Sequence, residues 1–264
     1  MARSTTEVLL LRAVDFGESD RIVHLLTPGS GRITAMAKGS RRSVKRFPGT
    51  LDLFNHLRVQ LYQRRPGRMA HLEHATLISP MLGIRRVPQR FALGCYLLEL
   101  FDRLAPEGLA PIESRELFGF ALAALRMVEE CSPDSRLRIL LELRTLEALG
   151  LRPELRLCVR CNREPRGSPE VGFSIADGGL VCGDCADRSD ASAALLSVHL
   201  GTVRSLEQVL LLGLDRLQRL SLGPEALAEA SLIVGRLARF HVGIEMRSER
   251  FLNEILERRS SAVA

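Results

Sequence analysis

The sequence predicts a multidomain protein of the α+β class, and three observations lead to this prediction. The first 80 of its 264 residues contain short runs of branched aliphatic residues separated by glycine and proline turns. From about Pro88 onwards the apolar residues follow a helical period instead. Four cysteines in two closely spaced pairs interrupt this helical part. With 46% hydrophobic and 26% charged residues, the chain has the composition of a globular protein.

Residues 1–80 are predicted to form five short strands. The runs are rich in branched aliphatic residues or alternate between apolar and polar positions, and they cover residues 7–14, 21–27, 32–37, 51–63 and 68–78. Closing so small a sheet into a barrel removes its exposed edges, and an OB-fold is a five-stranded barrel of this kind. We therefore predict an OB-fold domain over residues 1–80.

A basic segment follows the third predicted strand. It reads "KGSRRSVKRF" and brings together five cations without an acidic residue: Lys38, Arg41, Arg42, Lys45 and Arg46. The segment has no apolar period and is followed by Pro48-Gly49, which predicts a loop that is free to reach a partner. An OB-fold with such a loop would bind a flexible nucleic-acid strand between cations and stacking rings. Phe47, Phe54 and Tyr62 are candidate rings, although aromatic residues of strands more often belong to the core.

The net charge of +6 is concentrated in this N-terminal domain. Residues 1–80 contain 13 lysines and arginines against 6 acidic residues, whereas the remaining residues contain 24 against 25. A basic surface that is merely solvated would spread its charge evenly along the chain. The asymmetry therefore predicts a localised anionic partner.

The helical part begins with two segments that have a proline in the first turn, at Pro88 and Pro111. In the next segment, Ser132 is the predicted N-cap, Pro133 the first helical residue and Gly150 the stop signal. Further helices are predicted over residues 196–214, 224–242 and 248–259. We predict one helical domain with a first part at 81–157, a second part at 190–264 and an insert at 158–189 between them.

The insert carries the most specific pattern of the chain. Two C-x2-C pairs, twenty residues apart, place four thiolates where one tetrahedral Zn²⁺ can take them all: Cys158, Cys161, Cys182 and Cys185. The intervening "GFSIADGGLV" is predicted to form a hairpin that returns the chain. Four cysteines close the coordination shell, so we predict one structural zinc ion. Cys95 and Cys131 are predicted to be buried thiols.

The sequence contains no motif of a nucleotide-binding loop, a metalloprotease or a serine hydrolase. We therefore predict no catalytic residues and interpret the protein as a binding protein rather than an enzyme. No uncharged stretch is long enough to cross a membrane. The short apolar run at 8–11 is broken by Arg12, which argues against a signal peptide. A cytoplasmic location, associated with the nucleoid, is the expectation.

Three short motifs follow one another in the first 42 residues: Gly17-Glu18-Ser19-Asp20, then Gly31-Arg32, then Lys38-Gly39-Ser40-Arg41-Arg42. In this order they resemble the N-terminal sequence of the RecO family of bacterial recombination mediators. The resemblance continues through the helical part and the four-cysteine insert. It reaches "EMRSERFL" at 245–252, which is similar to the family's closing motif.

The resemblance implies an N-terminal OB-fold, a helical domain, a zinc element and an activity that is not enzymatic. It implies binding to single- and double-stranded DNA and annealing of complementary strands. With the partner RecR, such a protein helps RecA to replace single-strand-binding protein. The predicted DNA surface contains Arg32, Lys38, Arg41, Arg42, Lys45, Arg46, Arg64, Arg65 and Arg68.

A site for the acidic tail of single-strand-binding protein is expected in residues 81–157 or 190–257. The arginine-rich segment 136–144 could form its cationic rim, or its arginines could instead pair with Glu142 and its neighbours. Two other classes of function remain open. A basic barrel with a zinc element also fits an RNA-binding or transcription-associated module. An enzyme with unrecognised catalytic residues is the third alternative.

Overall fold

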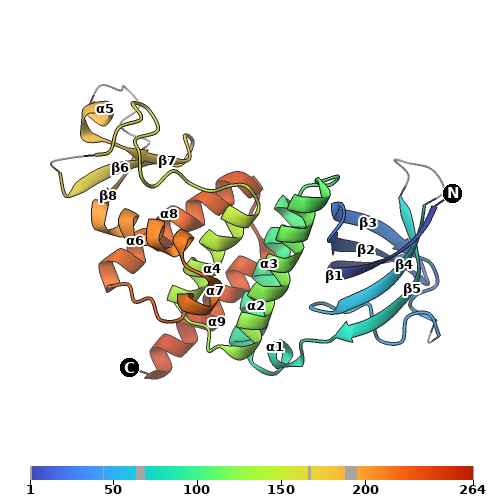
Figure 1. Cartoon of the computed structure of the whole chain (residues 1–264). Helices are drawn as coiled ribbons and strands as arrows, with labels where there is room; N and C mark the ends of the chain where they lie inside the picture. The colour runs from blue at the N-terminus through green and yellow to red at the C-terminus, as the bar shows by residue number, and fades with distance from the viewer. Residues whose placement is uncertain (1, 44, 64–68, 166–167, 188–194, 264) are drawn as a thin grey trace. The chain divides into compact units, whose positions relative to one another are not determined.

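The computed structural model describes residues 2–43, 45–63, 69–165, 168–187 and 195–263 (Figure 1). Its contacts divide the chain into two compact units. Unit 1 contains Met1–Ser132 together with Arg247–Ala264, and unit 2 contains Pro133–Met246. This grouping differs from the predicted domains, because the helices between residues 82 and 130 and the helix that begins at Arg247 pack in the same unit as the barrel.

Unit 1 begins with the predicted five-stranded barrel. Its strands are β1 (Ala2–Phe16), β2 (Asp20–Thr27), β3 (Gly31–Ala37), β4 (His56–Gln63) and β5 (Ala70–Ser79). The order around the closed barrel is β1-β2-β3-β5-β4, with β3 and β5 parallel and the other pairs antiparallel. The long strand β1 pairs with β4 and with β2, and its register shift between Leu10 and Arg12 lets the sheet close. The predicted OB-like barrel is thus confirmed.

The barrel interior is filled by the alternate, inward-facing residues of its strands. Val8, Leu10, Val23 and Leu25 are fully buried there. The same cluster includes Phe47 and Leu51, which come from the segment between β3 and β4. That segment is therefore attached to the barrel by its own apolar side chains.

In the described part of unit 1, four helices accompany the barrel: α1 (Leu82–Arg86), α2 (Pro88–Leu104), α3 (Pro111–Glu130) and α9 (Arg247–Val263). Pro88 and Pro111 lie at the predicted first helical positions. Helix α2 contacts β1, and α3 contacts β2 and β3. The fully buried Phe54 packs edge-on against Phe91 of α2, which ties the end of the barrel loop to the helix.

In unit 2, α4 (Ser135–Ala148) packs against α6 (Leu200–Leu211) and α8 (Pro224–Val242), and the short α7 spans Leu214–Leu217. The predicted N-cap of α4 at Ser132 was wrong. Asp134 is the N-cap, and its carboxylate accepts a hydrogen bond from the Leu137 N–H at 2.7 Å. Gly150 follows the helix with φ +79°, as expected for a stop signal.

The insert contributes β6 and β7 to a sheet in unit 2, which among the described residues has the order β7-β6-β8. The predicted hairpin consists of β6 (Glu170–Ser174) and β7 (Gly179–Val181), and α5 (Gly183–Asp187) follows it. Residues 196–199 were predicted as the start of a helix, and this was wrong. They belong to β8 (Leu195–His199), because alternate burial of Leu196 and Val198 and pairing with β6 favour a strand there.

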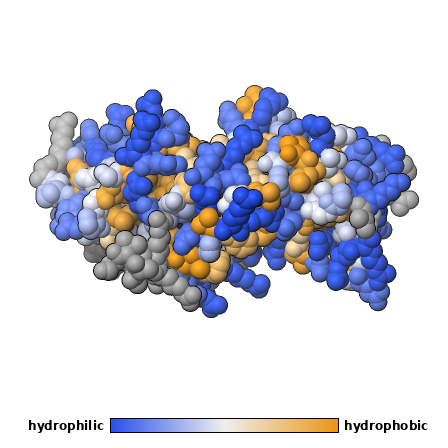
Figure 2. Space-filling model, turned by 90° about the horizontal axis from the view of Figure 1, so that it is seen from below, coloured by the Kyte–Doolittle hydropathy of each residue, from blue (hydrophilic) through white to orange (hydrophobic). Residues whose placement is uncertain are grey.

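The face of the molecule seen in Figure 2 is mostly hydrophilic, and its apolar side chains form separate small patches. Among the described helices, none combines the length and the apolar composition that a bilayer crossing requires.

Candidate nucleic-acid surface and metal centre

The basic loop, residues 38–47, is held against the turn between β1 and β2. The Gly39 N–H donates to the Asp20 carboxylate at 2.7 Å, and the Arg41 N–H donates to the Ser19 carbonyl at 3.0 Å. The bond from Gly39, with a second from the Ser19 hydroxyl, holds the pKa of Asp20 below its ordinary value. The turn residues therefore shape the start of the loop.

The far end of the loop is fixed to strand β5. The Ala75 N–H donates to the Arg46 carbonyl at 3.1 Å, and the Phe47 side chain is buried in the barrel core. The sequence predicted a loop that is free to reach a partner, and in this respect the prediction was wrong. Long-range hydrogen bonds and an apolar anchor hold the backbone, so the cations are presented at fixed places.

Most of the loop's charge faces solvent. Lys38 and Lys45 are exposed and have no acidic partner within ion-pair distance among the described residues. Arg41 lies 3.5 Å from Asp15, and Arg42 lies 3.7 Å from Glu18, with exposed side chains in both pairs. Such pairs are weak, so their cations remain available to an anion.

Arg46 is also exposed, and its position is well defined. Its guanidinium donates to the Lys38 carbonyl at 2.7 Å and lies 5.3 Å from the centre of the Phe47 ring. These contacts hold the two ends of the basic loop together. Lys38 and Arg46 consequently lie side by side, although seven residues separate them in the chain.

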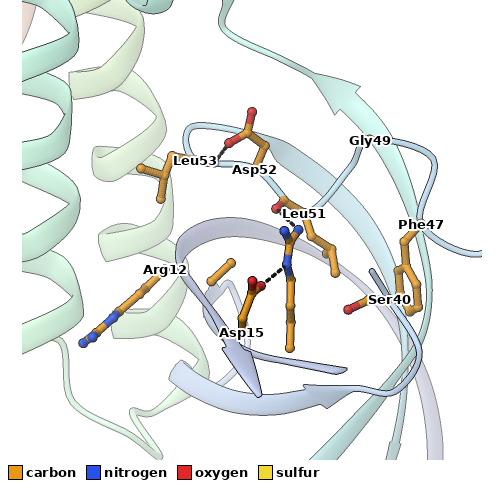
Figure 3. Close-up of a pocket in the computed structure, with 10 residues that line it drawn as sticks. Arg12, Asp15, Ser40, Phe47, Gly49, Leu51, Asp52 and Leu53 are labelled. Carbon is orange, nitrogen blue, oxygen red and sulfur yellow. Dashed lines mark hydrogen bonds and ion pairs between the residues drawn. The ribbon is translucent and has the colours of Figure 1, made fainter. Parts of the chain in front are cut away.

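Figure 3 shows the pocket beside the loop, with a volume of about 480 Å³. Arg21 bridges its walls, because it pairs with Asp15 at 2.9 Å and donates to the Leu51 carbonyl at 3.3 Å. Arg12 and Asp52 also line the pocket, so its cations and acids balance. The pocket lies where the chain that follows the basic loop packs against the barrel. The unbalanced positive charge of the basic loop lies outside this pocket.

Arg32 and the three other predicted arginines are placed differently. The guanidinium of Arg32 lies 2.9 Å from Glu107 and 3.7 Å from the buried Asp102, so acidic partners already surround it. Arg64, Arg65 and Arg68 lie outside the described residues. Of the candidate rings, Phe47 and Phe54 are buried, whereas Tyr62 is partly exposed on the outside of the barrel.

The arginines of the segment 136–144 take up structural contacts in unit 2. Arg136 donates to the carbonyls of Gln218 and Leu220, and Arg144 donates to the Leu210 carbonyl at 2.5 Å. Arg138 lies 3.6 Å from Glu142, which is itself buried. Of the pairs predicted with Glu142 and its neighbours, Arg138 forms one with Glu142, but this pair is buried and does not lie on a solvated face.

The four predicted cysteines come together in unit 2. Their Sγ atoms all lie within 4.8 Å of one another, and those of Cys161 and Cys182 are 3.7 Å apart. Cys158 and Cys161 precede β6, while Cys182 and Cys185 follow β7, so the hairpin brings the two pairs together. This cluster could hold one metal ion in a shell of four sulfurs.

The environment of Cys158 favours a thiolate. Burial alone would raise its pKa, but backbone N–H groups of Cys182, Cys161 and Arg160 point at the sulfur and lower the pKa to about 6. Hydrogen bonding with Cys182 raises the pKa of Cys185 to about 12. One of the four cysteines is therefore readily ionised. Four thiolates this close together would repel one another, so a bound cation is needed to stabilise them.

Comparison with known proteins covers nearly the whole chain. Residues 1–81 match a family model described as "Recombination protein O N terminal", and residues 85–250 match "Recombination protein O C terminal". Among the similar proteins, three named "DNA repair protein RecO" align with this chain over nearly its whole length. Identity is 32% with that of Anaeromyxobacter dehalogenans strain 2CP-1, over 97% of this chain and 98% of that protein. The Myxococcus xanthus protein is 31% identical over 97% and 99%, and the Syntrophus aciditrophicus protein 28% over 96% of each.

Proposed function

Since the chain belongs to the RecO family of DNA repair proteins, we propose that it binds DNA through the basic loop and anneals complementary single strands. With RecR, it helps to load RecA onto DNA that is coated by single-strand-binding protein. The observation that carries the proposal is the fixed loop with five exposed cations at one end of an OB-like barrel.

The geometry of the loop suits phosphate binding. Lys38, Arg41, Arg42, Lys45 and Arg46 neutralise phosphates, and the release of condensed counterions drives association. Contacts to phosphate carry no sequence information, so strands of any sequence can be held with base edges free to pair. We leave Arg32 out of the proposed surface, because Glu107 and Asp102 already pair with it.

The proposal is tested by replacing the five loop cations with glutamine and measuring DNA binding across salt concentrations. We expect weaker binding to all sequences, with the slope of log K against log[salt] reduced by roughly 0.7 per lost contact on single strands. The matched control removes charge from exposed arginines of unit 2: Arg216, Arg219 and Arg236. If the loop variant keeps the wild-type salt dependence of log K, the DNA binds to another surface and the proposal is wrong.

Strand annealing tests the mediator role separately. The protein should accelerate the pairing of complementary DNA strands coated by single-strand-binding protein, and the loop variant should not. An RNA-binding or transcription-associated module, the alternative function, would bind RNA in preference and leave the pairing rate of coated DNA unchanged.

For the cysteine cluster we propose one Zn²⁺ ion held by Cys158, Cys161, Cys182 and Cys185. Four thiolates leave no open position for water or substrate, so the ion would stabilise the fold and would not take part in a reaction. We accordingly propose that the protein acts by binding and not as an enzyme.

A further inference from the structure

A band of large side chains follows the strand pairings obliquely across the outside of the barrel. It is defined by direct strand pairings that link Val14, Ile22, Met36, His71, Tyr62 and Arg3 in this order. Directly paired residues point to the same face of a sheet. Their chain neighbours Val23, Ala35, Leu61 and Leu72 fill the barrel core, so the band itself faces outward.

Part of this band lines an open cleft of about 400 Å³. Tyr62 of β4 and His71 of β5 form its aromatic wall, with ring centres 6.4 Å apart and planes inclined by 29°. Met36 of β3 adds a flexible apolar surface. Arg3 lies with its guanidinium 6.0 Å from the Tyr62 ring and pairs with Glu73 at 3.1 Å.

The same cleft is lined by two cations of the basic loop, Lys38 and Arg46. Rings and cations therefore meet within one cleft, although they come from β4, β5 and the loop. Phosphates and bases alternate along a single strand, so a surface that holds both needs this combination. The volume of the cleft also falls within the usual range of small-ligand sites.

We propose that unpaired bases of single-stranded DNA stack on Tyr62 and His71 in this cleft, while Lys38 and Arg46 hold the adjoining phosphates. This inference rests on the proposed function and adds contacts that depend on the bases. A base in a duplex is covered by its neighbours and cannot enter. The cleft thus gives the protein a preference for single strands that the basic loop alone does not supply.

Tyrosine fluorescence reports on the cleft directly. The protein has no tryptophan and two tyrosines, Tyr62 and Tyr96, and Tyr96 is fully buried. Stacking of a base on Tyr62 should quench the emission when an oligo-dT strand is added. Tyr62→Phe should abolish this quenching and bind nearly as tightly as the wild type, because the ring remains. Quenching that persists in Tyr62→Phe would overturn the proposal.

Affinity measurements provide the second test. Tyr62→Ala should bind oligo-dT on the order of tenfold more weakly, since a single base-aromatic stack contributes this much. The same variant should bind an abasic oligonucleotide of the same length with the affinity of the wild type, because this ligand has phosphates but no bases. Phe240→Ala, which removes an exposed ring in unit 2, is the control and should bind oligo-dT as the wild type does.

The outcomes separate this inference from the proposed function. If Tyr62→Ala retains wild-type affinity for oligo-dT while the loop variant loses affinity, the cleft is not a base site and the loop function stands. If neither variant loses affinity, both proposals are wrong. Wild-type protein that binds abasic and normal strands equally would also overturn the base site.

Discussion

Gly31 lies where the turn between β2 and β3 touches the segment between α2 and α3. Its φ is +68°, and a Cβ atom at this position would lie 2.3 Å from the Pro106 carbonyl oxygen. The next residue, Arg32, donates its N–H to the same oxygen at 3.0 Å. The side chain of Arg32 then pairs with Glu107. The Gly31-Arg32 motif therefore joins the barrel to its neighbouring helices.

Gly31→Ala is expected to lower the free energy of unfolding by at least about 2 kcal/mol. The left-handed backbone disfavours a side chain by roughly 1–2 kcal/mol, and the Pro106 carbonyl must also move. Chemical denaturation of the reduced protein measures this change. Gly29→Ala is the matched control in the same turn, where a Cβ meets no atom within 4 Å, and it should change stability by less than roughly 0.5 kcal/mol. Equal effects of the two substitutions would contradict the argument.

The candidate sites differ in how much of them the sequence could predict. The spacing of Cys158 and Cys161 predicts a metal centre, because each pair is local in the chain. The bonds from Gly39 to Asp20 and from Ala75 to Arg46 join distant residues, so the fixed loop was not predictable. Tyr62 was a candidate ring, but its grouping with His71 in one cleft was not predictable, because it depends on the strand register and on the irregularity between Gln60 and Leu61.

At the scale of elements, a glutamate from another helix accepts a hydrogen bond from a backbone N–H at the start of each of three helices. Glu129 of α3 accepts from the Gly83 N–H at the start of α1, and Glu99 of α2 accepts from the Ser248 N–H at the start of α9. Glu229 of α8 accepts from the His199 N–H, directly before α6. These carboxylates satisfy free N–H groups and complement the positive end of the helix dipole. Proline starts could be predicted from the sequence, whereas these remote caps could not.

The pair of His199 and Glu229 should make stability depend on pH. Hydrogen bonding and attraction to Glu229 raise the pKa of His199. Burial would raise the pKa of Glu229, but hydrogen bonds from Thr202 and His199 outweigh it and lower that pKa. The contribution of His199 to folding stability is complete below its unfolded pKa of about 6.5. This contribution is lost as the pH rises through the raised pKa of the folded protein. The contribution of Glu229 to folding stability is complete above its unfolded pKa of about 4.3. This contribution is lost as the pH falls through the lowered pKa of the folded protein.

Thermal unfolding between pH 5 and pH 8 tests this pair. The difference in melting temperature between wild type and His199→Ala should be largest between about pH 4.5 and 6.5 and should shrink towards pH 8. Glu229→Gln should remove the same dependence, because it leaves His199 without its anionic partner. A difference that grows with rising pH would show that the histidine is stabilised in its neutral form.

At the scale of the whole molecule, the basic loop and the four-cysteine cluster belong to different compact units. The loop lies in unit 1, which has the barrel core, whereas the four cysteines lie in unit 2. The net charge follows the same division along the chain, since its excess lies in the first 80 residues. DNA binding and metal binding should therefore be separable.

Removal of the metal ion should destabilise unit 2 and leave DNA binding by the loop within about twofold. A structural zinc site contributes several kcal/mol, so the melting temperature should fall by about 10 °C or more after chelation or in Cys158→Ser. Elemental analysis should find one zinc ion per chain in protein purified under reducing conditions. Cys95→Ala and Cys131→Ala are controls that should leave the metal content unchanged. Reduced protein without metal would contradict the zinc assignment.

The pairing of α9 with α2 has a consequence for synthesis of the chain. Glu99 of α2 binds the first residues of α9, and Leu252 and Leu256 of α9 are buried. On the ribosome, residues 133–246 must be added between these partners, which takes on the order of ten seconds at usual elongation rates. During this interval α2 exposes the surface that α9 later covers. The unit whose residues are synthesised first is therefore completed only after α9 has been added.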